Sequence, residues 1–382
     1  MLQNLGTEGI RNIKDVINRI YTSGKMPDEF LKSHVIPLPK VKNTQACEEH
    51  RLISLISHGS KILLHIIKNR ITNIIDSKIS ECQLSYRKGK GTRDGIFILR
   101  TIGERMIQKN KKVYMVFIDY QKAFDRVNHE RLIEILKEEG TPAHEIRSIE
   151  NLYWNQKAVV ITEHGETEEV DILRGVRQGC ILSPILFNLY TERMIEEALQ
   201  GKRGIQINGE NMTNIRYADD TVLMAENEQE LQHLLQDVNQ ACKKYGMALN
   251  YKKTKVMIMG KGEIERIKIK LEDSELEQVN KYKYLGSWIT EEGRCLDEIK
   301  CRIGQAKMAF FDNKELLRGN INITVKKKII ETYIFSVLTY GSEAWTLTKE
   351  ARRRINAFEM WCYRRMLKIS WRRLMSNDQV LD

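Results

Sequence analysis

Residues 214–225, with the sequence NIRYADDTVLMA, place two adjacent carboxylates between two apolar segments. A polar centre with apolar flanks of this length is typical of a β-hairpin whose tip carries the polar residues. The segment therefore predicts a hairpin with Asp219 and Asp220 at its tip. Carboxylates at such a tip project from a rigid edge, which suits metal binding.

A third carboxylate lies at the end of another expected strand. Residues 113–118 are six apolar residues rich in β-formers, which predicts a buried strand, and Asp119 follows directly. Two divalent cations about 3.5–4 Å apart need bridging oxygen ligands, and aspartates from adjacent strands can supply them. Taken singly, an Asp after a strand is more often a helix cap, and an Asp-Asp pair more often a turn. The combination favours a metal site.

Hydrophobic periodicity predicts further elements along the chain. We expect a loop at the glycine-interrupted basic segment between Ser85 and Asp94, and a hairpin over residues 282–290 that turns at Gly286. From about residue 295 the chain becomes helical and basic, so a domain boundary is expected near 291–295. Helices are expected over residues 8–22, 60–75, 95–109, 125–139, 184–200 and 228–245, and short strands over 158–161 and 169–172.

Composition narrows the class of protein. A chain of 382 residues predicts two or three domains, and 42% hydrophobic residues suffice for a buried core. The net charge of +11 favours a polyanionic partner such as nucleic acid. The seven cysteines are scattered without zinc-site spacing, which indicates reduced thiols in an intracellular protein. No apolar run approaches the roughly 18 residues that span a bilayer, so we expect no membrane partner.

Five segments occur in the order and wording of a known family. They resemble the successive palm motifs of reverse transcriptases, above all those of LINE-type (non-LTR) retrotransposons. Two upstream segments, RLISLISHGSKIL (51–63) and QLSYRKGKGTRDGI (83–96), resemble the fingers motifs of the same enzymes. The five palm segments are FIDYQKAFD (117–125), RGVRQGCILSPILFN (174–188), YADD (217–220), LNYKKTKVM (249–257) and YLG (284–286).

The resemblance implies an α+β chain with the right-hand polymerase fold, in which helices back a ferredoxin-like palm sheet. It divides the chain into an N-terminal extension helix at residues 1–24, fingers and palm at 25–294, and a basic helical thumb at 295–382. The implied activity is that of an RNA-directed DNA polymerase, which extends a DNA primer on an RNA template with dNTPs. Basic helices could grip the backbone of such a hybrid.

The resemblance also assigns metal ligands and catalytic groups. Asp119, the Tyr120 carbonyl and Asp219 would hold two Mg²⁺ ions, or Mn²⁺ in their place, with Asp220 as a neighbouring ligand or a support. Lys253 matches the lysine of the fourth palm motif, which would act on the departing pyrophosphate as general acid. Considered alone, a lysine on a strand is more often an exposed charge.

Three residues would contact the incoming nucleotide from the palm. Phe124 matches the bulky gate that excludes a 2′-hydroxyl, with a core aromatic at the start of a helix as its alternative. Gln178 and Gly179 match a loop against the nucleotide, where glycine lets the backbone approach closely. Arg174 and Arg177 are either phosphate contacts or solvated loop charges.

From the fingers, Lys88, Lys90 and Arg93 would form a flexible basic loop over the triphosphate, and Arg51 is a second contact. A charge run is more often a solvated face. Leu52 departs from the small residue or proline that relatives commonly carry.

Tyr284, Leu285 and Gly286 match the primer grip, which holds the 3′ end of the primer. In the expected thumb, the runs Lys326–Lys328 and Arg352–Arg354 suit phosphate contact better than nuclear import.

Other readings remain open. One alternative is a catalytically inactive, nucleic-acid-binding remnant of the same element. A third reading, a group II intron maturase or a telomerase-like polymerase, would call for a maturase-type tail or an RNA-binding extension, and we find neither in the sequence. We expect a fragment without endonuclease or ribonuclease H activity, a nuclear location by analogy with the family, and an oligomeric state that the sequence leaves open.

Overall fold

The computed structural model of the chain describes residues 6–40, 44, 46–370 and 372–381. It forms two compact units, each built from several stretches of the chain. The first unit comprises residues 1–91, 116–254 and 268–277, and the second comprises residues 92–115, 255–267 and 278–382. Residues 371 and 382, which belong to the expected thumb, lie outside the described part.

The first unit combines helices with two larger sheets and two two-stranded ones, β7-β8 and β12-β13. Its helices are α1 (Thr7–Ser23), α2 (Asp28–Leu31), α3 (His58–Asp76), α5 (His129–Glu138), α6 (Ala143–Trp154), α7 (Ser183–Leu199) and α8 (Glu228–Lys244), with 3₁₀ turns η2 (Cys47–Glu49) and η3 (Ala123–Arg126). Its strands are β1 (Lys32–Pro39), β2 (His50–Leu55), β4 (Lys157–Thr162), β5 (Gly165–Glu166), β6 (Val170–Asp171), β7 (Ile205–Ile207), β8 (Glu210–Met212), β9 (Asn214–Tyr217), β10 (Asp220–Ala225), β12 (Lys270–Leu271) and β13 (Ser274–Glu275).

Two sheets of the first unit position the candidate residues. One has the order β2-β1-β4-β5, with β6 also paired to β4; β1 is antiparallel to β2 and parallel to β4. The other contains the second half of β3 (Val113–Ile118) followed by β10 and β9. β9 and β10 pair in antiparallel register, with Tyr217 opposite Asp220. The predicted hairpin with two carboxylates at its turn is therefore confirmed.

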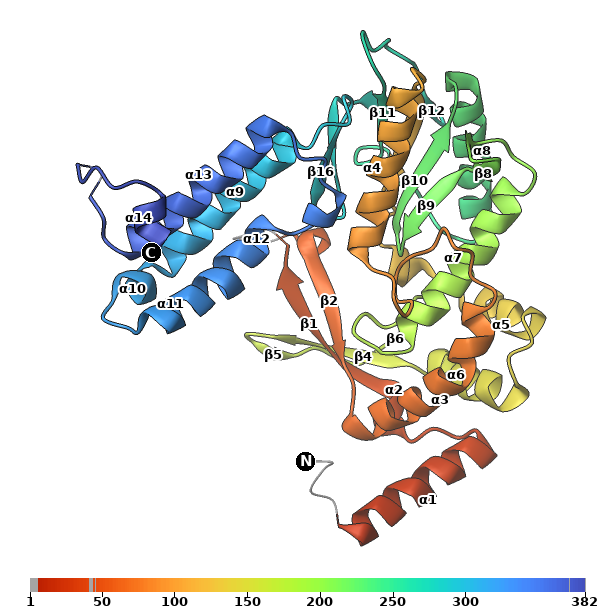
Figure 1. Cartoon of the computed structure of the whole chain (residues 1–382). Helices are drawn as coiled ribbons and strands as arrows, with labels where there is room; N and C mark the ends of the chain where they lie inside the picture. The colour runs from red at the N-terminus through yellow and green to blue at the C-terminus, as the bar shows by residue number, and fades with distance from the viewer. Residues whose placement is uncertain (1–5, 41–43, 45, 371, 382) are drawn as a thin grey trace. The chain divides into compact units, whose positions relative to one another are not determined.

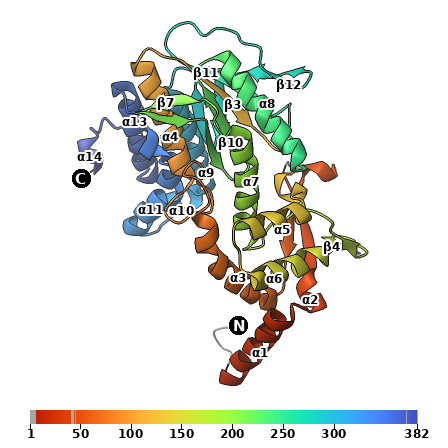
Figure 2. The same ribbon diagram turned by 90° about the vertical axis from the view of Figure 1, so that its right-hand side faces the viewer.

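Helices α7 and α8 cover the second sheet. α7 is buried around most of its circumference and packs against α3, α5 and α8, while α8 also packs on β10. Figures 1 and 2 agree that these two helices run beside the strands. Pro184 lies in the first turn of α7, as expected, because its missing N–H would have no partner there.

The second unit is mainly helical. Its core is formed by α9 (Leu296–Asp312), η4 (Ile330–Phe335), α12 (Ser336–Leu338) and α13 (Lys349–Met366), around buried residues such as Phe310, Ile334 and Phe358. Figure 1 shows α9 and α13 side by side. The unit contains α4 (Thr92–Gln108), the first half of β3, β11 (Lys255–Met259), the hairpin β15 (Lys281–Tyr284) and β16 (Ser287–Thr290), α9 (Leu296–Asp312), α10 (Lys314–Arg318), α11 (Ile323–Ile329), the π-helix η4 (Ile330–Phe335), α12 (Ser336–Leu338), the 3₁₀ turn η5 (Ser342–Ala344), α13 (Lys349–Met366) and α14 (Asp378–Leu381); the short strand β14 (Glu277–Gln278) spans both units.

The mixture of sheets and helices confirms the expected α+β class, and most predicted elements are present. One expected helix is wrong. Residues 125–139 contain η3 and then α5, because Phe124 and Val127 direct their carbonyls to the N–H groups of Val176 and Gly175. The Asn128 side chain accepts from the N–H of Arg131 and starts α5 there. The division into fingers, palm and thumb by residue range stays a prediction.

Candidate active site

The tip of the β9–β10 hairpin is held by one buried side chain. Ala218, at φ 56°, donates its backbone N–H to Oε1 of Gln83 at 3.1 Å. The same oxygen accepts from the N–H and the hydroxyl of Ser85 at 3.1 and 2.9 Å. Gln83 is 0% exposed, so it is a fixed acceptor for the residue that precedes Asp219.

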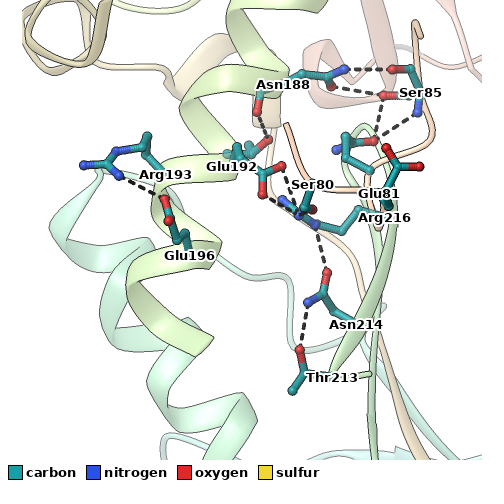
Figure 3. A network of polar contacts seen from close by, with 12 residues as sticks. Ser80, Glu81, Ser85, Asn188, Glu192, Arg193, Glu196, Thr213, Asn214 and Arg216 are labelled. Atoms are coloured by element: carbon teal, nitrogen blue, oxygen red, sulfur yellow. Dashed lines mark hydrogen bonds and ion pairs between the residues drawn. The ribbon is translucent and has the colours of Figure 1, made fainter. Parts of the chain in front are cut away.

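The segment that carries Gln83 is itself bonded to the hairpin. Arg216 donates its N–H to the carbonyl of Cys82, and its own carbonyl accepts from Leu84. The Arg216 guanidinium, 2% exposed, contacts Ser80, Glu192 and Asn214 (Figure 3). A buried arginine paired with a carboxylate fixes geometry, because removal of either partner leaves an uncompensated charge.

A second branch of this network ties the same segment to α7. Asn188 donates to the carbonyl of Ser85 at 2.8 Å and accepts from its hydroxyl at 3.0 Å (Figure 3). The residues of this network that the sequence did not predict are Gln83, Ser85, Asn188, Glu192 and Arg216. Two of them could have been found in the sequence. Arg216 is a charged residue inside the expected strand NIRY, and Glu192 is a carboxylate within a mainly apolar stretch of an expected helix.

Asp119 follows β3, and the segment that leads into β11 fixes its backbone. Its N–H donates to Thr254 Oγ1 at 3.3 Å, and its carbonyl accepts from the N–H of Asn250 at 2.8 Å. Tyr120 continues this pairing with an antiparallel bridge to Leu249. The strand end is therefore anchored on both sides of the carboxylate.

The three carboxylates influence one another. Burial raises the pKa of Asp219, and the negative charge of Asp119 raises it further. Neighbouring atoms remove the carboxyl group of Asp220 from water, although the residue as a whole is exposed. This loss of water contact, together with the negative charges of Asp219 and Asp119, raises the pKa of Asp220 to about 6. Burial also raises the pKa of Asp119, while the positive charge of Lys253 lowers it. Lys253 itself is exposed.

These carboxylates suit a divalent cation in donor chemistry and in charge. All their side-chain donors are oxygens, which hard cations prefer, and a cation would relieve their mutual repulsion. Throughout the described ranges, no three His, Cys, Asp or Glu side chains are arranged so that they could hold a metal ion together. The residues therefore fit the ion chemically, but their side chains are not arranged as a formed coordination shell.

The loop at residues 174–179 lies between η3 and β2. Gln178 donates to Asp125 Oδ1 at 3.1 Å, and its carbonyl accepts from Ser54 at 2.8 Å. Gly179 has φ 99°, and a side chain there would approach the Ser54 carbonyl at 3.1 Å. In the structure, the backbone of Gly179 therefore makes its close approach to the backbone of β2.

Phe124 lies partly at the surface and partly against the core, and its role as a gate against a 2′-hydroxyl stays a prediction. It is partly exposed, and its ring stacks on the fully buried Phe187 with centroids 4.3 Å apart. It lies in η3 instead of the start of a long helix.

Arg177 is neither a solvated charge nor an available phosphate contact. It is 5% exposed and donates to the carbonyls of Phe30 and Leu31 and to Gln156. Burial lowers its pKa. Both alternatives for this arginine were wrong, because its guanidinium donates to the backbone carbonyls of the last two residues of α2. Arg174 is exposed.

The basic residues expected over a triphosphate have different surroundings. Lys90 pairs with Glu81 at 2.5 Å, and Arg93 pairs with Glu343 at 2.7 Å. Arg93 lies in the first turn of α4, in the second unit, so the expectation that it belongs to a flexible loop is wrong. Lys88 is exposed, and so is Arg51, whose charge lowers the pKa of Asp219.

Tyr284, Leu285 and Gly286 belong to the second unit. Tyr284 ends β15 and is buried, and the turn to β16 consists of Leu285 and Gly286, with φ 46° and 82°. The hairpin predicted here, with its turn at Gly286, is confirmed.

A comparison with protein families shows to which family the chain belongs. The sequence model described as "Reverse transcriptase (RNA-dependent DNA polymerase)" matches residues 38–289, about two thirds of the chain. The chain belongs to the reverse transcriptase family. The matched range includes each expected palm motif, and members of this family generally use divalent metal ions.

Curated relatives of this reverse transcriptase come from retrotransposable elements. The Pol polyprotein of element R2 from Nasonia vitripennis is 26% identical over 286 residues, which cover 72% of this chain and 27% of that protein. The RNA-directed DNA polymerase of mobile element jockey from Drosophila funebris is 24% identical over 282 residues, covering 71% and 30%. The expected likeness to non-LTR retrotransposons is confirmed, and the chain spans about a third or less of these relatives.

Solved structures show the same fold. Apo telomerase from Candida tropicalis superimposes with a TM-score of 0.53 at 13% identity, over 95% of this chain and 68% of that chain. At this identity the likeness concerns the fold alone, and it confirms the expected polymerase fold. Within the described residues, every helix of the reverse transcriptase is too short or too polar to cross a bilayer.

Proposed function

We propose that this reverse transcriptase is an active RNA-directed DNA polymerase that extends a DNA primer on an RNA template with dNTPs. The observation that supports the proposal is the sheet order, in which β3 pairs with β10, so that Asp119 at the end of β3 comes near Asp219 and Asp220 of the β9–β10 hairpin. Their nearness is reflected in the raised pKa values of Asp219 and Asp220, to which the other carboxylates contribute. A fold selected only for binding a polyanion gains nothing from clustered negative charge, which repels phosphates.

Asp119, the Tyr120 carbonyl, Asp219 and Asp220 would hold two Mg²⁺ ions. Bound there, the ions supply charge that lowers the pKa of a primer 3′-hydroxyl and stabilises the leaving pyrophosphate. The chain's own contribution is positioning, because phosphoryl transfer leaves little covalent chemistry to the protein. Gln83 fixes the hairpin tip, and Thr254 with Asn250 fixes the backbone of Asp119.

The residues around this cluster would select and hold the nucleotide. The exposed edge of Phe124 would exclude a 2′-hydroxyl, while its stacking on Phe187 keeps the ring from moving aside. Gln178 and Gly179 would line the nucleotide, and exposed Arg51 and Lys88 would contact its phosphates. Lys90 and Arg93 would first have to leave their partners Glu81 and Glu343.

Exposed Lys253 would protonate the departing pyrophosphate. The proton transfer needs a cation within reach of the leaving oxygen, and the electrostatic effect of Lys253 on Asp119 supports its nearness to the carboxylates. Tyr284, Leu285 and Gly286 would hold the primer end, and the net charge of +11 supports a nucleic-acid partner. A nuclear location is part of the proposal.

The test is primer extension on poly(rA)/oligo(dT) with dTTP and Mg²⁺. We expect Asp219→Asn to lower the rate by more than about a hundredfold, since even outer partners of metal ligands are worth 10–100-fold. Asp273→Asn, at an exposed loop position between β12 and β13, is the matched control and should keep full activity.

The outcomes separate an enzyme from a remnant. Extension that requires Mg²⁺ and disappears in Asp219→Asn supports the polymerase. A folded wild-type protein that binds the hybrid but does not extend it would instead be the catalytically inactive, nucleic-acid-binding remnant.

A further inference from the structure

The β15–β16 turn of the second unit is held by side chains from later parts of the chain: Arg302 lies in α9, and Tyr340 lies in the turn after α12. Tyr340 donates its hydroxyl to the carbonyl of Leu285 at 2.8 Å. Arg302 donates to the carbonyl of Gly286 at 2.5 Å. Both carbonyls of the two-residue turn are therefore bonded to residues that follow it by 16 to 55 positions.

These two side chains form one assembly with Glu298. The Arg302 guanidinium lies over the Tyr340 ring, 4.4 Å from its centroid, and its Nε donates to Glu298 Oε1 at 2.6 Å. Glu298 Oε2 accepts from the backbone N–H of Trp288, the second residue of β16, at 2.7 Å. Glu298 and Arg302 are 1% and 8% exposed. We call Glu298, Arg302 and Tyr340 the turn clamp.

A further buried arginine completes the attachment. Arg100 of α4, 4% exposed, donates to the carbonyl of Trp288 at 2.7 Å and to the hydroxyl of Ser287 at 3.2 Å. Every residue from Leu285 to Trp288 thus has at least one polar group bonded to α4, to α9 or to Tyr340.

The backbone gives a reason for this attachment. Leu285 has φ 46°, a left-handed conformation that is unfavourable for a residue with a branched side chain. Such conformations persist where surrounding groups determine them, and they gather at functional sites. A hairpin that only connected two strands would need no buried charge pair to hold its turn.

We propose that the turn clamp positions the Leu285–Gly286 turn for the primer, so that turn and α9 behave as one rigid piece. The inference rests on the proposed function, since it assigns Glu298, Arg302 and Tyr340 as positioning residues for the primer grip. The clamp acts on primer binding and on retention of the primer between additions. It does not act on the nucleotide or on the chemical step.

The experiment measures KM for the primer–template, KM for dTTP, kcat and product length in the presence of a trap that captures released enzyme. Tyr340→Phe removes the hydroxyl and keeps the ring under Arg302, so the fold should be preserved. We expect a primer–template KM roughly fivefold higher, in the range of one lost hydrogen bond. Arg302→Lys, which keeps the charge but not the fork of donors, should raise it roughly tenfold. Product length should shorten, while kcat and the KM for dTTP stay unchanged.

Tyr363→Phe is the matched control, because it removes a tyrosine–carboxylate hydrogen bond on α13 without touching the hairpin. Unchanged primer KM and product length in folded Tyr340→Phe and Arg302→Lys would overturn the proposal, as would a fall in kcat alone or a changed dTTP KM. Should wild type itself show no extension, hybrid affinity is measured by fluorescence anisotropy. Weaker binding in both variants would then support the clamp while the polymerase proposal fails, and unchanged binding would reject both.

Discussion

Hairpins β9–β10 and β15–β16 both turn through a non-glycine residue in the left-handed region, Ala218 at φ 56° and Leu285 at φ 46°. In the first, a side chain accepts from a backbone N–H: Gln83 holds Ala218. In the second, side chains donate to backbone carbonyls: Tyr340 and Arg302 hold Leu285 and Gly286. The anchors Gln83, Tyr340 and Arg302 lie 135, 55 and 16 positions from the residues that they hold.

The difference follows from what each tip carries. The first tip bears carboxylates whose pKa values are already raised, so an ionised acceptor beside Ala218 would add repulsion. A neutral amide provides the hydrogen bond without the charge. The second tip bears no ionisable group, and its anchor is a buried arginine compensated by Glu298. Reciprocal exchanges of glutamine and glutamate test this contrast.

Gln83→Glu has the largest expected effect. It keeps an acceptor for Ala218 but introduces an unpaired buried charge, because Arg216 is already bonded to Glu192. We expect the free energy of unfolding to fall by about 4 kcal/mol at about pH 8. Burial raises the pKa of the new carboxyl in the folded state, so the loss shrinks as pH falls and the group protonates. Urea denaturation at neutral and acidic pH measures this.

Primer extension gives a second measure of the same variant, which should lose at least about a hundredfold in rate as the metal ligands shift. Gln240→Glu, on the exposed side of α8, is the control and should change stability by no more than about 0.5 kcal/mol. Equal stability of Gln83→Glu and wild type at neutral pH would reject the idea that the first anchor has to be neutral.

Glu298→Gln tests the charged anchor. It preserves size and leaves an acceptor for Trp288, but it leaves the buried Arg302 without its carboxylate. We expect the free energy of unfolding to fall by about 3 kcal/mol, as for other broken buried pairs. Glu350→Gln, which breaks an exposed glutamate–arginine pair at the same i,i+4 spacing on α13, should not measurably change stability. Similar effects in both variants would mean that burial of the clamp has no energetic weight.

Ala218→Gly tests the strain of the first turn. A left-handed alanine is about 1 kcal/mol less favourable than a glycine there, so the variant should be more stable by up to that amount. The tip becomes more flexible, and the rate of primer extension should fall severalfold. Calorimetry and primer extension on the same preparation check both expectations. A loss of stability would show that the Gln83 hydrogen bond already determines the turn without strain.

The contrast also shows which parts of the site could be predicted from sequence. Asp119 and Asp219 stand at strand ends, where apolar periodicity stops, and the hairpins follow from local alternation. The anchors depend on tertiary pairing between residues such as Gln83 and Ala218, 135 positions apart, which no local pattern encodes. Arg177 shows the same limit, since a loop arginine became buried only because the carbonyls of Phe30 and Leu31 face it.

Helix boundaries failed for the same physical reason. The expected helix over residues 125–139 has favourable periodicity, but hydrogen bonds from Gly175 and Val176 interrupt its first turn. The helical propensity of this segment was outweighed by hydrogen bonds to a loop that follows it by about 50 residues.

Asp220→Asn has the smallest expected effect and isolates the charge of the first tip. The pKa of Asp220 is raised to about 6, so the folded chain binds more protons than the unfolded chain between an ordinary carboxyl value and that pKa. Stability contributed by this group therefore falls as pH rises through that window. The variant should match wild type at acidic pH and exceed it by about 0.5 kcal/mol at about pH 8, a small value because Asp220 is exposed and solvent screens its charge. Millimolar Mg²⁺ should stabilise wild type more than the variant. Denaturation curves of wild type and variant, with and without Mg²⁺, measure both effects. A difference in stability between the two proteins that stays the same at every pH would show that Asp220 carries no share of the repulsion at the tip. The reason for a neutral anchor would then rest on Asp219 alone.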